Sequence, residues 1–376
     1  MSYKAKKNIG LRQNLLAVLE RWLSRSMAFK FLVNIHKTPV TDLPSDFHCA
    51  NSVLVVLPFE MLETALQMDN LLMLITHYTK SGATITLLCE QLVYPLVSGF
   101  KDVAIQRYDR DDRSIFNKSW KMLCRSYAKK TDICIVLEKN PDFPVLYLAA
   151  KTFAPIKVGY GSGSLWPYIN ISINSSDPQK RISSQNCFLA STLGAKNKTV
   201  RWSTSKSTIE GARHQLKERS IQLSGQLVGL DLYYFSSLFE RSWVEELVRR
   251  VQKLSDYSFY SFGALNEQIA VPQWISETGV VVVAPLTVPR TAALIATSRF
   301  IITGKSPVFG MGSLLSTDII GIFEQSQQSL YCSDLEMVKA VPYIESPDDK
   351  TIDAVILQLN QGKEKKQKAV QNKKKR

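Results

Sequence analysis

The stretch LTVPRTAALIATSRFIITGKSP, residues 286–307, contains the pattern that decides the fold. Its first part, 288–298, has the apolar and small residues of a buried helix face. An apolar run of four residues, 300–303, follows almost at once and predicts a buried strand. A helix that leads directly into a buried strand is typical of an α/β unit with a parallel sheet.

The same alternation continues on both sides of this stretch. In the second half of the chain we expect a helix at 242–254 and strands at 227–232, 258–263, 279–284 and 318–323. In the first half we expect helices at 60–80, 114–129 and 144–153 and strands at 53–57, 83–89, 103–107, 133–137 and 156–160. The polar segment 174–220 separates the two halves and is predicted to connect them, with some helix at 207–220.

We therefore predict an α/β protein with two Rossmann-like domains that face each other across a cleft, the GT-B architecture. The predicted boundaries are 46–205 for the first domain and 206–360 for the second. A basic extension, 1–45, precedes them and contains an amphipathic helix at 11–34. A disordered basic tail, 361–376, follows them.

The net charge of +14 is concentrated at the two ends of the chain. Residues 1–40 and 363–376 each carry eight Lys or Arg and one acid, which leaves 31 basic and 31 acidic residues in between. This distribution suits binding of the termini to an anionic membrane, binding to another acidic polymer, or simple solvation. Because residues 41–362 carry no net charge, we do not expect binding of nucleic acid. The helix at 11–34 either lies on a membrane or packs on its own domain or on a protein partner.

Several classes of protein are not expected. The six cysteines are scattered without a CxxC pair, and the four histidines form no triad or ligand spacing, so we expect neither a metal site nor a cofactor. No signal peptide and no apolar stretch long enough to span a bilayer is expected, so the predicted location is the cytoplasm, with peripheral binding to the inner membrane as an open alternative. Thr303-Gly304-Lys305-Ser306 is not a P-loop, because position 299 is Arg instead of Gly. The glycines at 159–164 predict only a flexible turn.

Residues 286–307 resemble the ADP-heptose:lipopolysaccharide heptosyltransferase family, in which a helix such as "L-x-E-L-A-A-L-I-A" precedes a strand and the motif "G-N-D-T-G-P-x-H". Segment 318–323 resembles the strand that follows in that family. In the first half, 53–56, 132–137 and 156–160 are similar to the family's early strands, and 241–243 is similar to its "K-x-W-P". The resemblance covers about residues 50–345.

The resemblance implies a glycosyltransferase that uses a nucleotide-diphosphate sugar and an envelope polysaccharide or lipid-linked acceptor. Glu63 corresponds to the family's acceptor base. The residues implied to hold the donor diphosphate are Arg241, Thr303, Gly304, Lys305 and Ser306.

This sequence departs from the family pattern at several of these positions. Lys305 replaces the family's Asp, Ser306 its Thr, Pro307 its Gly and Gly310 its His, and Leu62 replaces the Gly before the base. Backbone N–H groups and a helix dipole can still attract phosphate at such a turn. Two functions therefore stay open: an active enzyme, or a catalytically inactive pseudoenzyme that serves as a binding or scaffolding subunit. In the second case Glu63 is a solvated acid at a helix start and Arg241 is a surface cation.

Overall fold

A computed structural model describes residues 50–128, 130–160, 168–173, 189–195, 202–222, 226–263, 265, 272–283, 287–332 and 337–374. The described residues form two compact units, the first from Ala50 to Ala195 and the second from Trp202 to Lys374. The sequence places this boundary at 205/206. The predicted helix at 11–34 and the predicted turn at 161–164 lie outside the described residues.

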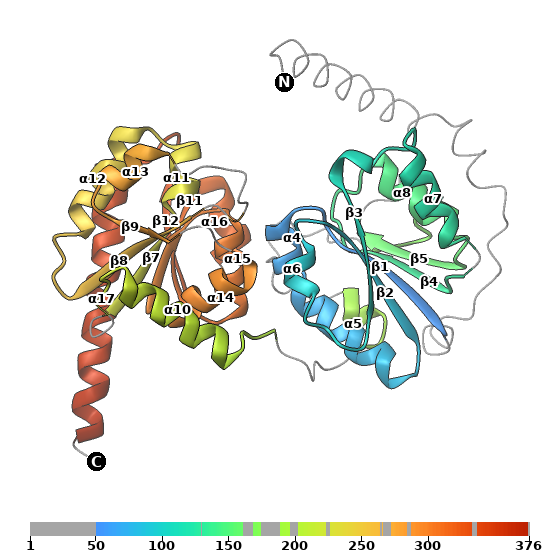
Figure 1. The fold of residues 1–376 in the computed structure, drawn as a ribbon, viewed down its shortest axis with the longest axis horizontal. Coiled ribbons are helices and arrows are strands. Elements are labelled where there is room, and N and C mark those ends of the chain that lie inside the picture. Colours follow the sequence, from blue (N-terminus) through green and yellow to red (C-terminus); the bar gives the residue numbers. More distant parts are fainter. Residues whose placement is uncertain are drawn as a thin grey trace, which may run out of the picture. The chain divides into compact units, whose positions relative to one another are not determined.

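The first unit contains a sheet of six parallel strands in the order β3-β2-β1-β4-β5-β6 (Figure 1). The strands are β1 (Ser52–Val56), β2 (Thr84–Glu90), β3 (Ala104–Tyr108), β4 (Ile133–Val136), β5 (Ile156–Tyr160) and β6 (Ile171–Ile173). The helices are α4 (Met61–Leu66), α5 (Met68–Lys80), α6 (Tyr94–Val97), the 3-10 turn η1 (Arg110–Asp112), α7 (Lys118–Ser126) and α8 (Phe143–Lys151).

The second unit contains another six-stranded parallel sheet, in the order β12-β11-β10-β7-β8-β9. Its strands are β7 (Gln226–Leu230), β8 (Tyr257–Phe262), β9 (Val281–Val283), β10 (Phe300–Thr303), β11 (Asp318–Glu324) and β12 (Val338–Tyr343). Its helices are α10 (Lys206–Glu218), α11 (Leu232–Leu238), α12 (Arg241–Val251), α13 (Gln273–Glu277), α14 (Val288–Thr297), α15 (Pro307–Leu314), α16 (Gln325–Cys332) and α17 (Asp349–Lys374).

The two sheets have the same topology. In each, the first strand of the unit lies between the second and the fourth, so the strand order reverses once, as in a Rossmann fold. The prediction of two Rossmann-like α/β units is thus confirmed. The reversal lies between β1 and β4 in the first unit and between β7 and β10 in the second. Ligands of such folds bind next to the reversal, at the carboxyl ends of the strands.

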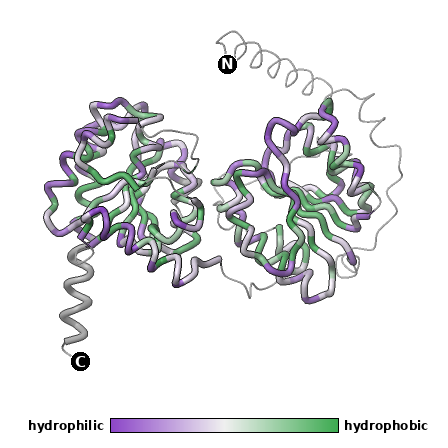
Figure 2. The backbone as a smooth tube through the Cα atoms, in the orientation of Figure 1, coloured by the Kyte–Doolittle hydropathy of each residue, from purple (hydrophilic) through white to green (hydrophobic). Residues whose placement is uncertain are grey.

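The central strands are buried on both faces, which explains their continuous apolar sequences. In the first unit, Leu54 and Cys134 are register partners and pack with Trp120 of α7 and Leu148 of α8. Figure 2 shows the hydrophobic colour concentrated along the strands of both units. Burial also raises the pKa of the Cys89, Cys124 and Cys134 thiols to about 12, so these three cysteines are inert core residues.

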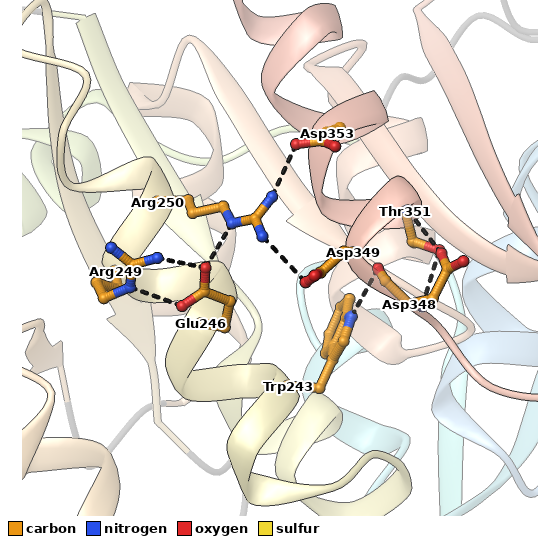
Figure 3. Close-up of polar contacts among 8 residues, drawn as sticks. All are labelled: Trp243, Glu246, Arg249, Arg250, Asp348, Asp349, Thr351 and Asp353. Atoms are coloured by element: carbon orange, nitrogen blue, oxygen red, sulfur yellow. Dashed lines mark hydrogen bonds and ion pairs between the residues drawn. The ribbon is translucent and has the colours of Figure 1, made fainter.

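Helix α17 is joined to α12 by polar contacts at its first turns (Figure 3). Trp243 Nε1 donates a hydrogen bond to the Asp348 carbonyl at 3.1 Å, and Arg250 pairs with Asp349 at 3.0 Å and Asp353 at 2.8 Å. The apolar side chains Ile352, Val355 and Leu359 of α17 are completely buried in the core of the second unit.

Residues 361–374 continue α17 in the structure, whereas the sequence predicts a disordered tail from residue 361. The difference has a physical reason. Lys, Gln, Glu and Ala all have good helix propensity, and extending a helix that is already packed needs no new nucleation. Among the described residues, no helix is both long enough and apolar enough to cross a membrane.

Candidate functional site

In the second unit, two polar side chains meet where the strand order reverses. Asp231 directly follows β7, and Thr303 is the last residue of β10. Since these strands are paired, with Leu230 opposite Ile302, their carboxyl ends lie side by side. The Asp231 backbone N–H donates to the Ile302 carbonyl at 3.0 Å and fixes the carboxylate at this edge.

Asp231, Thr303 and Ser306 form a buried cluster, which we call the hydroxyl cluster. Both hydroxyls donate to Asp231 Oδ2, from Thr303 Oγ1 at 2.7 Å and from Ser306 Oγ at 2.5 Å, and the two hydroxyl oxygens are 2.8 Å apart. The three residues are at most 4% exposed. Burial raises the pKa of Asp231, and the hydrogen bonds act in the opposite direction. The cluster therefore locks the 303–306 turn onto the end of β7.

The rest of the turn depends on Tyr234 of α11. A Cβ on Gly304 would lie 2.4 Å from Tyr234 Cε1 and 3.0 Å from the Ile322 carbonyl oxygen, so only glycine fits there. The Tyr234 hydroxyl also has a hydrogen bond with the backbone of Lys305. The Lys305 side chain itself is exposed, at the residue before the N-cap of α15. Ser306 occupies that N-cap position but makes no side-chain cap, because its hydroxyl bonds to Asp231.

Arg241, which the sequence analysis places with the donor diphosphate, has other partners in the structure. It is the first residue of α12 and pairs with Glu245 at 2.6 Å and with Glu277 at 3.5 Å. Its guanidinium also lies over the Trp274 ring, 5.4 Å from the centroid. These described contacts join Arg241 to α12 and α13, and its role toward a ligand stays a prediction.

In the first unit, Glu63 lies in the first turn of α4, the helix that follows β1. It is half-buried, and its charge acts on two residues that come after β4, Glu138 and Lys139. Burial lowers the pKa of Lys139, and the negative charge of Glu63 opposes this shift. Glu63 is therefore close to other charged groups at the β1/β4 reversal, where a Rossmann-like unit binds its ligand.

A buried arginine organises the same edge, and we call its group the arginine cluster. Arg113 Nη2 donates to both Glu138 oxygens, at 3.0 and 2.9 Å, and lies 2.9 Å from Asp142 Oδ1. The side chains of Arg113 and Glu138 are only 5% and 3% exposed. The guanidinium also lies over the Phe59 ring, at 4.7 Å from the centroid. Burial would lower the pKa of Arg113, but the charges of Asp142 and Glu138 outweigh burial and raise it.

Glu138 differs from an ordinary surface carboxylate. Burial raises its pKa to about 7, Arg113 lowers it in part, and the nearby charges of Asp142 and Glu63 raise it further. A carboxyl group with this pKa changes protonation state near neutral pH, which suits proton transfer. The described residues contain no group of three or more His, Cys, Asp or Glu side chains that could hold a metal ion.

Glu63 and the 303–306 turn can be named from the sequence, but four polar residues that lie near them in the structure were missed. These are Arg113, Glu138, Asp142 and Asp231. Two of them carry a signal that can be read from sequence. Glu138 and Asp231 are each an acid directly after an apolar strand, and an acid at that place is costly unless it has partners. Arg113 has no comparable signal.

These observations define a class of protein with two Rossmann-like sheets and a polar cluster at each strand-order reversal. Solved structures that share this fold include glycosyltransferases. A glycosyl transferase family 9 protein from Veillonella parvula matches with a TM-score of 0.63 and 15% identity, over 82% of this chain and 91% of that one. The E. coli ADP-heptose lipopolysaccharide heptosyltransferase II matches with a TM-score of 0.60 and 15% identity, over 84% and 99% of the two chains.

A third structure, the E. coli heptosyltransferase WaaC with ADP, gives a TM-score of 0.59 at 15% identity, over 83% of this chain and 99% of that chain. No protein-family model matches the sequence, and no curated protein is significantly similar to it. The resemblance stated from the sequence motifs is thereby confirmed at the level of the fold.

Proposed function

We propose that this chain is a glycosyltransferase of the heptosyltransferase type, which transfers a sugar from a nucleotide-diphosphate donor to an envelope polysaccharide or lipid-linked acceptor. The observation that carries the proposal is that both polar clusters lie at the strand-order reversals of their sheets. In Rossmann-like folds this edge is where nucleotides bind. The fold is shared with proteins whose names state this activity.

On the donor side, the 303–306 turn and the start of α15 hold the diphosphate. The hydroxyl cluster fixes the turn, the positive end of the α15 dipole attracts the phosphates, and the exposed Lys305 adds a charge-assisted contact. The Thr303 and Ser306 hydroxyls can donate hydrogen bonds to the diphosphate only if they turn away from Asp231. Arg241 joins the site if it leaves Glu245 and Glu277.

On the acceptor side, Glu63 takes the proton of the acceptor hydroxyl while the oxygen attacks the anomeric carbon. The bond from that carbon to the diphosphate breaks, and the nucleoside diphosphate leaves with the electron pair. The charge of Glu63 acts on Glu138 and Lys139, so the proposed base lies among the charged groups of this sheet edge.

A second candidate function is a catalytically inactive subunit that binds a partner protein. One observation favours it: both hydroxyls of the donor turn are buried against Asp231, and the next residue, Pro307, has no backbone N–H to offer a phosphate. In either case, the basic segments 1–40 and 363–376 provide electrostatic attachment to an anionic membrane or to a protein partner.

Isothermal titration with ADP-, UDP- and GDP-sugars tests the donor site. We expect saturable binding of one donor, weakened about tenfold or more in Lys305→Ala, because a charged phosphate contact is lost. Lys253→Ala removes another exposed lysine of the same unit and serves as the matched control. Absence of binding to all three donors would contradict the proposal.

Turnover separates the two candidate functions. With the donor identified, Glu63→Gln should still bind the donor but should transfer sugar at least about a hundredfold more slowly, because the base is gone. Donor binding without transfer to any lipid-linked or polysaccharide acceptor in the unchanged protein would favour the inactive subunit.

A further inference from the structure

Helix α7 presents a surface that neither proposed function uses. Trp120 and Cys124 point into the core of the first unit, each about 1% exposed. The opposite side of the helix, and the segments just before and just after it, carry exposed basic and apolar side chains. These residues, which we call the α7 surface, are Phe116, Lys118, Lys121, Met122, Arg125 and Lys130.

The α7 surface is strongly basic although the body of the chain is neutral. Between Ser114 and Thr131 the sequence has five Lys or Arg and no Asp or Glu. A sixth cation, Lys151 at the end of α8, is close enough to act electrostatically on Cys124 of α7. The nearest acids before the helix, Asp111 and Asp112, belong to η1, and Asp112 accepts a hydrogen bond from Asn117 at 2.8 Å.

The apolar members of the α7 surface are unusually exposed for their size. Phe116 is 46% exposed and Met122 is 59% exposed. With 100° per residue along a helix, Lys118, Met122 and Arg125 lie on one side, with Lys121 beside them. The surface therefore combines apolar groups with cations on long, flexible stems, which can reach past them.

This combination fits an anionic lipid surface. Lys and Arg side chains are attracted to lipid phosphates near such a membrane, and apolar side chains gain further free energy by entering the headgroup region. We propose that the α7 surface binds an anionic bilayer, with Phe116 and Met122 inserted between headgroups and the basic side chains at the lipid phosphates. The proposal is independent of catalysis and concerns a folded helix, not the basic ends of the chain.

The test is sedimentation of the full-length protein with vesicles of phosphatidylglycerol and phosphatidylcholine. Lys118→Glu/Lys121→Glu/Arg125→Glu should lower the partition coefficient about tenfold or more. The control Lys206→Glu/Arg213→Glu/Lys217→Glu changes the net charge by the same amount at exposed positions of α10. This control should lower the partition coefficient less than about threefold. An equal loss in the two triple variants, or no loss in the first, would overturn the proposal.

A second pair of variants tests insertion. Phe116→Ser/Met122→Ser should lower binding about fivefold, and the loss should persist at high salt because burial of apolar groups is not screened. Leu238→Ser/Leu357→Ser removes two apolar side chains of similar exposure, 55% and 54%, from the second unit and should leave binding unchanged. Circular dichroism verifies that all variants are folded. Unchanged binding of the Phe116/Met122 variant would contradict insertion.

Discussion

The two units have the same strand order but contain opposite chemistry at the reversal. The arginine cluster of the first unit holds one buried cation between two carboxylates, with Glu63 and Lys139 nearby. The hydroxyl cluster of the second unit holds one buried carboxylate that is satisfied by neutral hydroxyl groups. One fold thus supports a charged edge suited to proton transfer and a neutral edge that fixes a backbone turn.

The largest predicted loss of stability comes from a substitution in the arginine cluster of the first unit. Arg113→Ala would leave Glu138 and Asp142 without their cation, and we expect it to lower the free energy of unfolding by about 3–5 kcal/mol, measured by urea denaturation. Arg110→Ala is the matched control, because Arg110 lies over the same Phe59 ring but is exposed. Its loss should cost less than about 1 kcal/mol. Equal effects of the two variants would mean that the ion pairs of Arg113 contribute little.

Substitutions in the hydroxyl cluster should lower the free energy of unfolding by a smaller amount. The loss should depend on whether a hydrogen-bond acceptor is kept more than on the charge of Asp231. Asp231→Ala leaves two buried hydroxyls without their acceptor and should cost about 2–3 kcal/mol in thermal or urea unfolding. Asp231→Asn keeps a hydrogen-bond acceptor in the same place and should cost about 1 kcal/mol. If Asn proves as harmful as Ala, the negative charge matters and the contrast between the two units is weaker than the geometry indicates.

The most gradual predicted effect is a dependence of stability on pH, which belongs to the first unit. The pKa of Glu138 is raised to about 7 in the folded protein, so the folded state binds more protons than the unfolded state between about pH 4.5 and pH 7. Glu138 therefore lowers stability as pH rises through this window, by at most about 1.4 kcal/mol for each pH unit. Glu138→Gln should remove this part of the slope in unfolding measured from pH 5 to pH 8. An unchanged slope would show that Glu138 stays ionised throughout.

Much of the fold could be predicted because buried parallel strands have continuous apolar sequences. The strand predicted at 300–303 agrees with β10, Phe300–Thr303, and the others agree within a few residues. Two edge strands, β6 and β12, were missed, although the edge strands β3 and β9 were predicted. In β12, Lys339 and Pro342 interrupt the apolar run, which is tolerated only at the edge of a sheet. The helix α11 was also missed, because the predicted strand was extended past Asp231 to Leu232.

The candidate site could be predicted only where it is local in sequence. The 303–306 turn follows directly from its strand, and Glu63 follows from the helix after β1. The residues that support them are brought together over long separations: 75 positions between Asp231 and Ser306, and 25 between Arg113 and Glu138. Which distant residues come into contact is determined by the order of the strands in the sheet. The spacing of residues along the chain does not reveal this order.

The way α17 is anchored has a practical consequence for handling this protein. The buried side chains of Ile352, Val355 and Leu359 make the beginning of that helix part of the hydrophobic core of its unit, while the lysine-rich end lies beyond these residues. A stop codon placed after Gln361 should spare the hydrophobic interior, and one placed before Ile352 should yield insoluble material. A purification tag is therefore best fused at Gln361 or beyond it, and not before Leu359.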